Sequence, residues 1–570
     1  MNTKTTSIER YRTALKGLRS GHPPAVHPGD PEAQLIPPVK ALLEELLGVE
    51  VRLEVRTERG RPDLGVWADG LLVGFVELKA PGKSLDPKSF RGHDQEQWKQ
   101  FKDLPNLVYT NGEAFVLYRQ GAAVREATLE QEEALVALLE DFRHWQPQVP
   151  RSAKELARFL APIVRFLRRA VDEAVKGQPD GPLARLWGEW QRTLLPEADA
   201  ETFADAYAQL LAYGFLLARG SGAQSLEEVL QVLEGRYGLI AEALFVANHP
   251  RVLGEIRPAY DLLRRAVRAV DPEALRGDGK ADPWLYFYEE FLEAYDPELR
   301  KNRGVYYTPV AVVQAMVRLV DDLLRESLGQ PLGLAEKGVT VLDPAAGTGT
   351  FLLSVLEKAL ENATARYGEG VRAQYATEVA QRLHAFEIMI GPYAVAQLRL
   401  SQAVAEAGGQ IPPEGLKLYL ADTLEAPDAS LLEQPFFYDR LTEERRRAAV
   451  VKRKTPILVC IGNPPYDRGK KEKAGQNNWI VFGKKNPHDP TSPPPLEDFL
   501  KPAREQGLGR HLKNLYNLYV YFWRWASWKV FEQNPGAGII AFITASSYLR
   551  GPAFAGMREW LRRQADTIYI

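Results

Sequence analysis

The sequence of 570 residues contains one cysteine, Cys460. A single thiol excludes a disulfide framework and any zinc or iron–sulfur site built from several cysteines, so a bound metal must use carboxylates or histidines. No stretch is apolar over the length that a bilayer span requires, and the first residues contain no apolar core of signal-peptide length. We therefore expect a soluble, cytoplasmic protein without a membrane partner.

The sequence also lacks a charge of one sign, since its formal net charge is -2. This balance gives no basic signature for nucleic-acid binding, although basic residues gather between residues 468 and 513. A phosphate-binding loop of the form G-x-x-x-x-G-K-[ST] is missing as well, because GDGKAD at Gly277 has neither the preceding strand nor the spacing. ATP-powered translocation is therefore not expected.

What is present indicates a multidomain α/β protein, because 45% of the residues are hydrophobic and the chain is long enough for about three domains. Residues 1–145 contain strand-like runs such as LLVGFVELK between turn signals, which predicts an α/β domain. Residues 146–295 carry apolar residues at helical spacing, which predicts an all-α spacer. From residue 296 to residue 570, apolar strand candidates alternate with helical segments, which predicts a doubly wound, Rossmann-like parallel sheet.

The strongest motif is VTVLDPAAGTGTFLLSVLEKAL, a β-branched strand followed by a glycine-rich turn and a helix that opens near Phe351. Gly347 and Gly349 allow a tight turn and a close approach of the backbone to a ligand. Asp343, at the end of the strand, faces the crevice in which such sheets bind nucleotides. This motif alone indicates only a nucleotide-binding α/β fold.

A second motif, Asn463-Pro464-Pro465-Tyr466, directly follows the apolar run ILVCIG. The two prolines make the turn rigid and point no N–H group into the site. Two acceptors, the Asn463 side-chain oxygen and the Pro464 carbonyl, can then be aimed at one exocyclic amino group. An adenine amino group is a poor nucleophile until both of its protons are held, so this arrangement favours methyl transfer by polar preorganisation. Tyr466 supplies a stacking face for a base flipped out of duplex DNA.

Over residues 285–570 the sequence resembles the amino-methyltransferases of bacterial restriction–modification systems, especially the adenine-N6 enzymes fused to a nuclease in one polypeptide of the type IIG and type ISP kinds. The resemblance implies S-adenosylmethionine as the cofactor. It implies that the cofactor is bound by Tyr307, Thr308, Pro309, Asp343, Ala345, Gly347, Gly349, Phe351, Glu387 and Asp422. Glutamine methyltransferases share the NPPY pattern, but the fused nuclease argues against them. Cytosine-N4 enzymes usually carry serine in place of Asn463, so Asn463 argues, less strongly, against that alternative.

A third constellation lies near the amino terminus, where Asp69-Gly70 separates two apolar runs as a hairpin turn. Residues two apart on a strand face the same side, so Glu77 and Lys79 are expected to point together toward Asp63. Two carboxylates favour Mg²⁺, and the lysine would orient or activate the attacking water. The pattern resembles the PD-(D/E)xK nuclease core, with Gln97 matching a family glutamine and Glu32 as a further acidic candidate.

Together these motifs predict a bifunctional enzyme that methylates adenine N6 at a specific site in double-stranded DNA and cleaves unmodified DNA with Mg²⁺. The alternative is a defence-system DNA adenine methyltransferase whose N-terminal domain is inactive and only binds DNA or a partner. The sequence ends within a strand-like run, so we expect further strands and a target-recognition domain to lie beyond residue 570. The sequence does not determine the oligomeric state.

Overall fold

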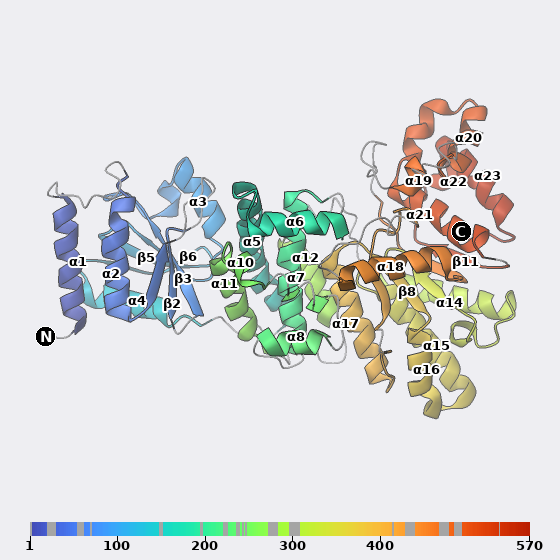
Figure 1. The fold of residues 1–570 in the computed structure, drawn as a ribbon, viewed down its shortest axis with the longest axis horizontal. Helices are drawn as coiled ribbons and strands as arrows, with labels where there is room; N and C mark the ends of the chain where they lie inside the picture. The colour runs from blue at the N-terminus through green and yellow to red at the C-terminus, as the bar shows by residue number, and fades with distance from the viewer. Residues whose placement is uncertain are drawn as a thin grey trace. The chain divides into compact units, whose positions relative to one another are not determined.

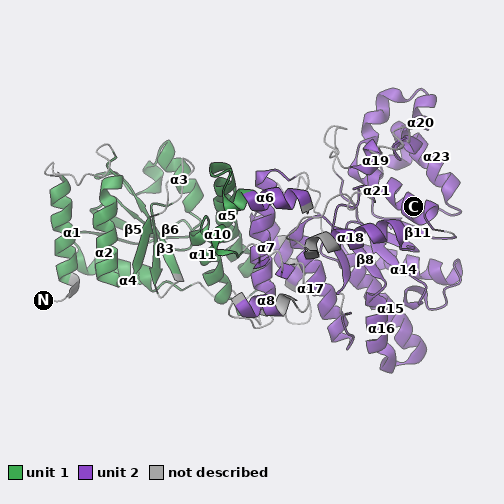
Figure 2. Ribbon diagram, in the orientation of Figure 1, with its two compact units in different colours: residues 1–184, 248–277 green, residues 185–247, 278–570 purple. Residues whose placement is uncertain are grey.

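The computed structural model describes residues 3–19, 30–53, 62–68, 71–146, 152–193, 198–220, 226–234, 240–241, 244–245, 248–271, 283–295, 308–412, 415–427, 439–466, 478–483, 493–534 and 536–570. These residues form a mixed α/β protein (Figure 1). The chain divides into two compact units, one of Met1–Ala184 with Asn248–Gly277 and one of Arg185–Ala247 with Asp278–Ile570 (Figure 2). Each unit contains one of the two sheets.

The sheet of the first unit has the strand order β1-β2-β3-β4-β5-β6, and only β3 and β4 pair in parallel. The strands are β1 (Glu50–Leu53), β2 (Leu64–Ala68), β3 (Leu71–Leu78), β4 (Leu107–Thr110), β5 (Ala114–Arg119) and β6 (Ala122–Thr128). The predicted hairpin is present, since β2 pairs antiparallel with β3. Its turn, Asp69-Gly70, lies outside the described residues.

Three helices, α1 (Thr3–Arg19), α2 (Ile36–Leu47) and α4 (Glu132–Arg143), pack on one face of this sheet through a shared apolar core (Figure 1). Helix α3 (His93–Phe101) coincides with the predicted helix HDQEQWKQF and lies on the other side. Helix α5 (Ala153–Gly177) also packs there, with the Phe166 ring 5.3 Å from the Phe75 ring of β3. The Ser152 hydroxyl starts α5 by accepting from the Glu155 backbone N–H.

All described residues between 153 and 295 that belong to regular elements are helical, but these helices do not form a unit of their own. Helices α5, α10 (Pro250–Leu253) and α11 (Arg257–Arg268) belong to the first unit. The second unit includes α6 (Pro182–Thr193) from residue 185 onward, together with α7 (Ala200–Gly220), α8 (Leu226–Glu234) and α12 (Pro283–Tyr295). The predicted domain boundaries at residues 145 and 295 therefore remain predictions.

The second unit contains a fully parallel sheet of order β11-β10-β7-β8-β9, which confirms the predicted parallel sheet. The strands are β7 (Val341–Asp343), β8 (Leu383–Glu387), β9 (Lys417–Leu420), β10 (Val459–Gly462) and β11 (Ile539–Phe542). The strand order reverses between β7 and β10, because the chain first adds β8 and β9 on one side of β7 and then β10 and β11 on the other. In open α/β sheets, ligands bind at the carboxyl ends of the strands at such a switch point.

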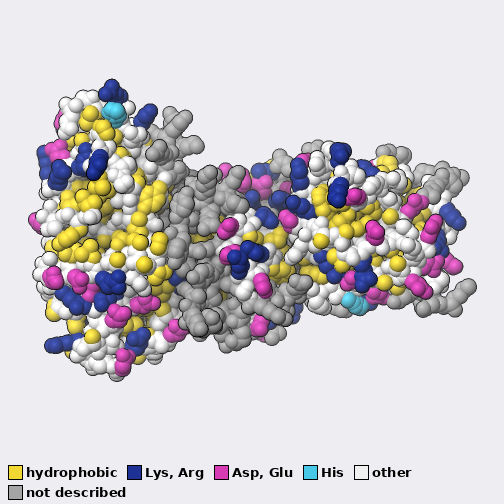
Figure 3. Space-filling view, turned by 180° about the vertical axis from the view of Figure 1, so that it is seen from behind, with side chains coloured by type: hydrophobic (Ala, Val, Ile, Leu, Met, Phe, Trp, Pro, Cys, Tyr) yellow, Lys and Arg dark blue, Asp and Glu magenta, His cyan; other side chains and the backbone are white. Residues whose placement is uncertain are grey.

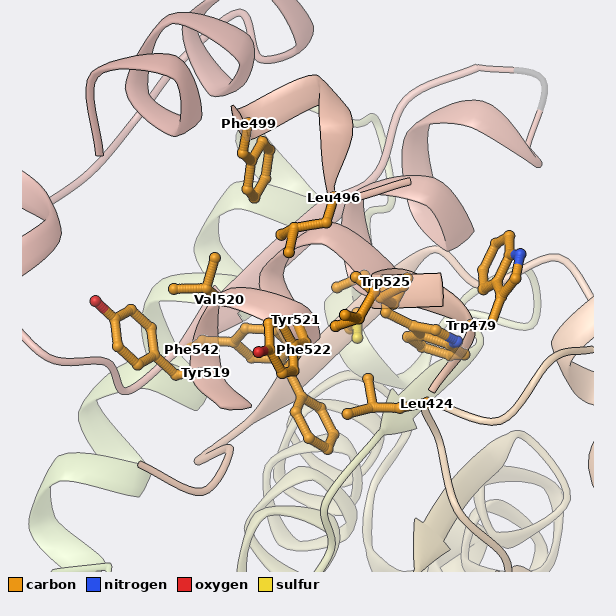
Figure 4. Close-up of a cluster of buried hydrophobic side chains, with 14 of the residues drawn as sticks. Leu424, Trp479, Leu496, Phe499, Tyr519, Val520, Tyr521, Phe522, Trp525 and Phe542 are labelled. Atoms are coloured by element: carbon orange, nitrogen blue, oxygen red, sulfur yellow. The ribbon is translucent and has the colours of Figure 1, made fainter. Parts of the chain in front are cut away.

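Helices surround this sheet, and several of them supply one large aromatic core. The helices are α14 (Val310–Glu326), α15 (Thr350–Tyr367), α16 (Arg372–Ala380), α17 (Ile390–Glu406), α18 (Asp439–Lys454), α19 (Trp479–Phe482), α20 (Glu497–Glu505), α21 (Leu518–Ser527), α22 (Ser547–Arg550) and α23 (Ala555–Gln564). Figure 4 shows that α21 provides many of the core side chains, including Tyr519, Tyr521 and Trp525, which pack with Phe542 of β11. Tyr466 packs against the same cluster.

Two general features of the described residues bear on partners. None of their helices is both long and apolar enough to cross a membrane. On the face seen in Figure 3, basic and acidic side chains are interspersed, and no wide area of one charge sign is visible among the coloured residues. Part of the basic run between residues 468 and 513 (Arg468, Lys470, Lys471, Lys473, Lys484 and Lys485) lies outside the described residues.

We predict that Arg265→Ala destabilises the first unit, because Arg265 connects α11 to Leu72 of β3 and to Trp145. Its guanidinium donates to the Leu72 carbonyl at 2.8 Å and to the Trp145 carbonyl at 2.6 Å. Loss of both bonds should lower the free energy of unfolding by about 1–3 kcal/mol. Urea unfolding followed by tryptophan fluorescence measures this, with Arg268→Ala on the exposed side of α11 as the control. Equal stability of the two variants would contradict this role of Arg265.

Candidate active sites

The glycine-rich turn follows β7 and leads directly into α15. Gly347 and Gly349 have φ angles of +55° and +81°, a region that strongly favours glycine. A side chain at Gly349 would also meet the Ala396 Cβ atom of α17 at 3.2 Å. Phe351 is buried in the first turn of α15, and Ala345 is partly buried. The turn thus requires glycine for its backbone conformation and, at Gly349, for the close packing of α17.

Two carboxylates lie beside this turn. Asp343 is buried and accepts from the Ala345 N–H at 3.0 Å. Burial raises the pKa of Asp343 to about 8, and the charge of Glu387 adds to this shift. Glu387, at the end of β8, accepts from the Gly347 N–H and the Met389 N–H, both at 2.8 Å. The structure therefore brings Asp343, Gly347 and Glu387 together, although more than 40 residues separate Asp343 from Glu387 in the sequence.

These groups fit the chemistry of S-adenosylmethionine. Its amino-acid portion carries an ammonium group, its sulfur is a cation and its ribose has hydroxyl donors, all of which suit carboxylate acceptors. At Gly347 an added Cβ atom would meet no other atom within 4 Å, so the backbone is open on that side. Asp422 follows β9, and its side chain accepts from the Leu424 N–H at 2.8 Å.

The Asn463-Pro464-Pro465-Tyr466 turn follows β10, which pairs in parallel with β7. Asn463 donates through Nδ2 to the Thr308 hydroxyl at 3.0 Å, and its Oδ1 accepts from the Tyr466 hydroxyl at 2.8 Å. The Tyr466 ring lies 6.2 Å from the Tyr519 ring, and burial raises the pKa of Tyr466 to about 12. Gly462 is required here, because a Cβ atom would lie 2.7 Å from Asp343 Oδ1.

The lead-in motif is described only in part. Thr308 lies against Asn463, and Pro309 is the exposed residue that precedes α14. Tyr307 lies outside the described residues. The bond from Asn463 to Thr308 is a feature that sequence reasoning missed. No sequence signal reveals it, because 155 residues separate the two side chains.

The second candidate site lies in the first unit, at the end of the hairpin formed by β2 and β3. Asp63 accepts from the Leu78 N–H at 2.8 Å, and Lys79 donates to Glu77 at 2.9 Å. Lys79 also donates to Gln97 of α3 at 2.6 Å, and Glu32 accepts from the Ala80 N–H at 3.1 Å. All five residues singled out in the sequence therefore gather at one end of this sheet.

The ionisable side chains of this cluster shift the pKa values of one another. Burial raises the pKa of Glu77 to about 8, and the charge of Asp63 raises it further. Burial lowers the pKa of Lys79, but the charge of Glu77 and the hydrogen bond that Lys79 donates to it outweigh this effect, so the pKa of Lys79 is raised overall. Among the described residues, the buried Glu77 Oε2 atom has no hydrogen-bond partner. A buried acceptor without a partner is unfavourable, and a cation bound there would satisfy it.

Asp94 is a member of this cluster that sequence reasoning missed. It lies on α3 and contacts Lys79 at 3.3 Å and Lys83 at 2.5 Å. The signal was present, because Asp94 and Gln97 are three residues apart on the predicted helix and therefore share a face. Tyr109 was missed as well, and its ring centroid lies 5.6 Å from the Lys79 ammonium. Among the described residues, no group of three or more histidine, cysteine, aspartate or glutamate side chains is arranged to hold a metal ion.

The second unit thus has the doubly wound parallel sheet, the glycine-rich turn and the Asn-Pro-Pro-Tyr turn of an amino-methyltransferase. Residues 282–488 match the model of the family described as N-6 DNA Methylase. The chain therefore contains an N6-adenine DNA methyltransferase domain, and this family implies S-adenosylmethionine as the cofactor.

The whole chain is also similar in fold to solved structures. One is DrdV in a cryo-EM complex with DNA, with 21% identity, a TM-score of 0.52, and coverage of 98% of this chain and 52% of that one. Another is LlaBIII, an ATP-dependent type ISP restriction–modification enzyme bound to DNA, with 23% identity, a TM-score of 0.50, and coverage of 76% and 27%. The chain spans about half the length of DrdV and about a quarter of LlaBIII. The predicted resemblance to fused restriction–modification enzymes is confirmed at the level of the methylase domain and the fold.

We predict that binding of S-adenosylmethionine at pH 7 releases protons from Asp343. The raised pKa keeps this carboxyl largely protonated below about pH 8, and a cationic ligand beside it favours the charged form. Affinity should therefore rise as the pH approaches 8. Titration calorimetry in buffers of different ionisation enthalpy measures the released protons. Asp343→Asn should abolish the release, whereas Asp322→Asn, on the exposed side of α14, should not. Unchanged release in Asp343→Asn would assign it to another group.

Proposed function

We propose that the chain methylates the N6 atom of adenine in duplex DNA and cleaves unmodified DNA with Mg²⁺. The observation that carries the methylation half is the Asn463 carboxamide, which lies after β10 beside the turn of β7, with Oδ1 on the side of Tyr466. The DNA complexes of DrdV and LlaBIII favour DNA as the substrate. We also propose that methylation occurs at a specific DNA sequence.

In this proposal, residues at the carboxyl ends of the strands of the parallel sheet bind and orient S-adenosylmethionine and the target adenine. Asp343, Glu387 and Asp422, together with Thr308, Pro309 and the backbone of the glycine-rich turn, would hold S-adenosylmethionine, which supplies an electrophilic methyl group when bound. Asn463 Oδ1 and the Pro464 carbonyl accept the two hydrogens of the adenine amino group, so its lone pair is directed toward that methyl group. The bound cofactor would supply the methyl group to the adenine nitrogen and keep the sulfur as a thioether, and the surplus proton of the amino group would leave to water.

Tyr466 also contacts the proposed acceptor of the adenine amino group. Its hydroxyl donates to Asn463 Oδ1, the atom that is proposed to accept from adenine. A carbonyl oxygen can accept two hydrogen bonds, so the phenol and the adenine amino group need not exclude each other. Pro465 keeps the turn rigid between these two side chains, and the ring of Tyr466 would stack on the flipped base.

We predict that Asn463→Ala lowers the rate of methyl transfer by about 100- to 1,000-fold, because it removes a preorganised acceptor. Binding of S-adenosylmethionine should stay near the wild-type level, since the glycine-rich turn is intact. Transfer of tritiated methyl groups to mixed-sequence duplex DNA measures the rate, and calorimetry measures binding. Asn514→Ala, at an exposed asparagine, is the matched control. Near-wild-type transfer by Asn463→Ala would refute the assignment.

The nuclease half of the proposal is carried by the buried Glu77 Oε2 atom, which has no hydrogen-bond partner among the described residues and which a bound cation would satisfy. Asp63 and Glu77 are the proposed Mg²⁺ ligands, with Glu32 as a further acid close by. Lys79 would orient the attacking water, and Gln97 holds the Lys79 ammonium in place. We therefore propose that the first sheet belongs to a nuclease of the PD-(D/E)xK class and that residues 146–295 are an all-α spacer.

A second candidate function keeps the methyltransferase and leaves the first unit without catalysis, as a domain that only binds DNA or a partner. One observation favours it: the Lys79 ammonium already contacts Glu77, Gln97 and Asp94, so its donors are fully engaged. Incubation of plasmid DNA with Mg²⁺, with and without S-adenosylmethionine, separates the two candidates. Linear or nicked products that need Mg²⁺ support the nuclease, and intact plasmid supports the second candidate.

We predict that Lys79→Ala and Asp63→Ala each abolish Mg²⁺-dependent cleavage and leave methyl transfer intact, because the two sites lie in separate units. Lys99→Ala, at an exposed lysine on the same helix as Gln97, is the control and should cleave normally. Agarose gels measure cleavage, and tritium incorporation measures methylation. Loss of both activities in a variant with wild-type circular dichroism would show that the sites are not independent.

A further inference from the structure

The Asn463 carboxamide is held at both ends in the structure. Its nitrogen donates to Thr308 Oγ1 at 3.0 Å, and its oxygen accepts from the Tyr466 hydroxyl at 2.8 Å. Tyr466 belongs to the same rigid turn, whereas Thr308 comes from the segment that leads into α14. The bond to Thr308 therefore connects the Asn463 side chain to a different part of the unit.

The orientation of this amide decides what the site can recognise. A carboxamide presents an acceptor at one end and two donors at the other. If the group were reversed, its N–H donors would face the donor hydrogens of an adenine amino group, and no hydrogen bond would form. The arrangement with Nδ2 on Thr308 leaves the oxygen on the side of Tyr466, where the proposed base is expected to stack.

The geometry points to Thr308 as a positioning residue that holds the Asn463 carboxamide in the orientation required for adenine. This inference rests on the proposed methylation function. It differs from the cofactor contact that the sequence resemblance implies for Thr308, because the observed bond uses a lone pair of the hydroxyl oxygen. The proton of the same hydroxyl remains available as a donor, so the two roles are chemically compatible.

The contact between Asn463 and Thr308 is partly shielded from solvent. Asn463 and Thr308 are both partly buried, and Asn463 lies between the buried Gly462 and the buried Pro464. An amide nitrogen that loses its partner in such a setting is poorly hydrated, and the carboxamide loses one of its two restraints. The rigid prolines fix the backbone of the turn but do not fix the side-chain rotation of Asn463. Tyr466 restrains the oxygen end from within the turn, and Thr308 restrains the nitrogen end from another part of the unit.

The test compares Thr308→Val, which has the same shape but no acceptor, with Thr308→Ser, which keeps the hydroxyl. At saturating S-adenosylmethionine, kcat for methyl transfer should fall about 3- to 10-fold in Thr308→Val, as expected for one hydrogen bond. Thr308→Ser should restore most of the lost rate. If Thr308→Val raises only the KM for S-adenosylmethionine and kcat is unchanged, Thr308 is a cofactor contact and the inference is wrong.

A second measurement does not depend on activity. In protein labelled with ¹⁵N-asparagine, the side-chain NH₂ signal of Asn463 is identified by its absence in Asn463→Ala. Thr308→Val should shift this signal and speed its hydrogen exchange, and Thr308→Ser should not. An unchanged signal in Thr308→Val overturns the inference. If wild-type protein methylates no DNA, the proposed function fails, and this signal alone decides whether Thr308 holds the amide.

Discussion

The parallel pairing of β10 with β7 is the constraint on which the second unit depends. It sets Val459 opposite Val341 and Cys460 opposite Leu342, so both strands end at the same edge of the sheet. The glycine-rich turn and the Asn-Pro-Pro-Tyr turn therefore emerge side by side, although over 100 residues separate them. The pairing tolerates no side chain at Gly462, because the Asp343 carboxyl occupies that space. The residues that we propose for cofactor binding and base recognition meet for this reason.

The first unit buries several ionisable side chains close to one another. Asp63, Glu77, Lys79 and Asp94 are all largely buried. Lys79 contacts Glu77 and Asp94, and the more exposed Lys83 also contacts Asp94. A buried ion pair repays its desolvation only where the remaining polar atoms are also satisfied. Glu77 Oε2 is not satisfied among the described residues. This imbalance costs stability in the free protein and is what a bound cation would relieve.

Much of this architecture was predictable from the sequence, because it rests on local patterns. β-branched runs bounded by turn signals predicted the strands of the parallel sheet, and helical spacing predicted the helices. The division of the helices between the two units was not predictable, because an amphipathic helix has the same periodicity whichever surface it packs on. The contacts of Asn463 with Thr308 and of Lys79 with Asp94 are tertiary, so residue types suggested the sites but not how these side chains are held.

We propose that the residues around Asn463 direct methyl transfer to adenine N6. To test this, duplex DNA is incubated with the protein and S-adenosylmethionine carrying a deuterated methyl group, and the nucleosides are then analysed by mass spectrometry. We expect deuterated N6-methyldeoxyadenosine with the wild-type protein and, at equal reaction time, about 100- to 1,000-fold less of it with Asn463→Ala. Label in N4-methyldeoxycytidine instead, or label found only in added protein substrates and not in DNA, would contradict it.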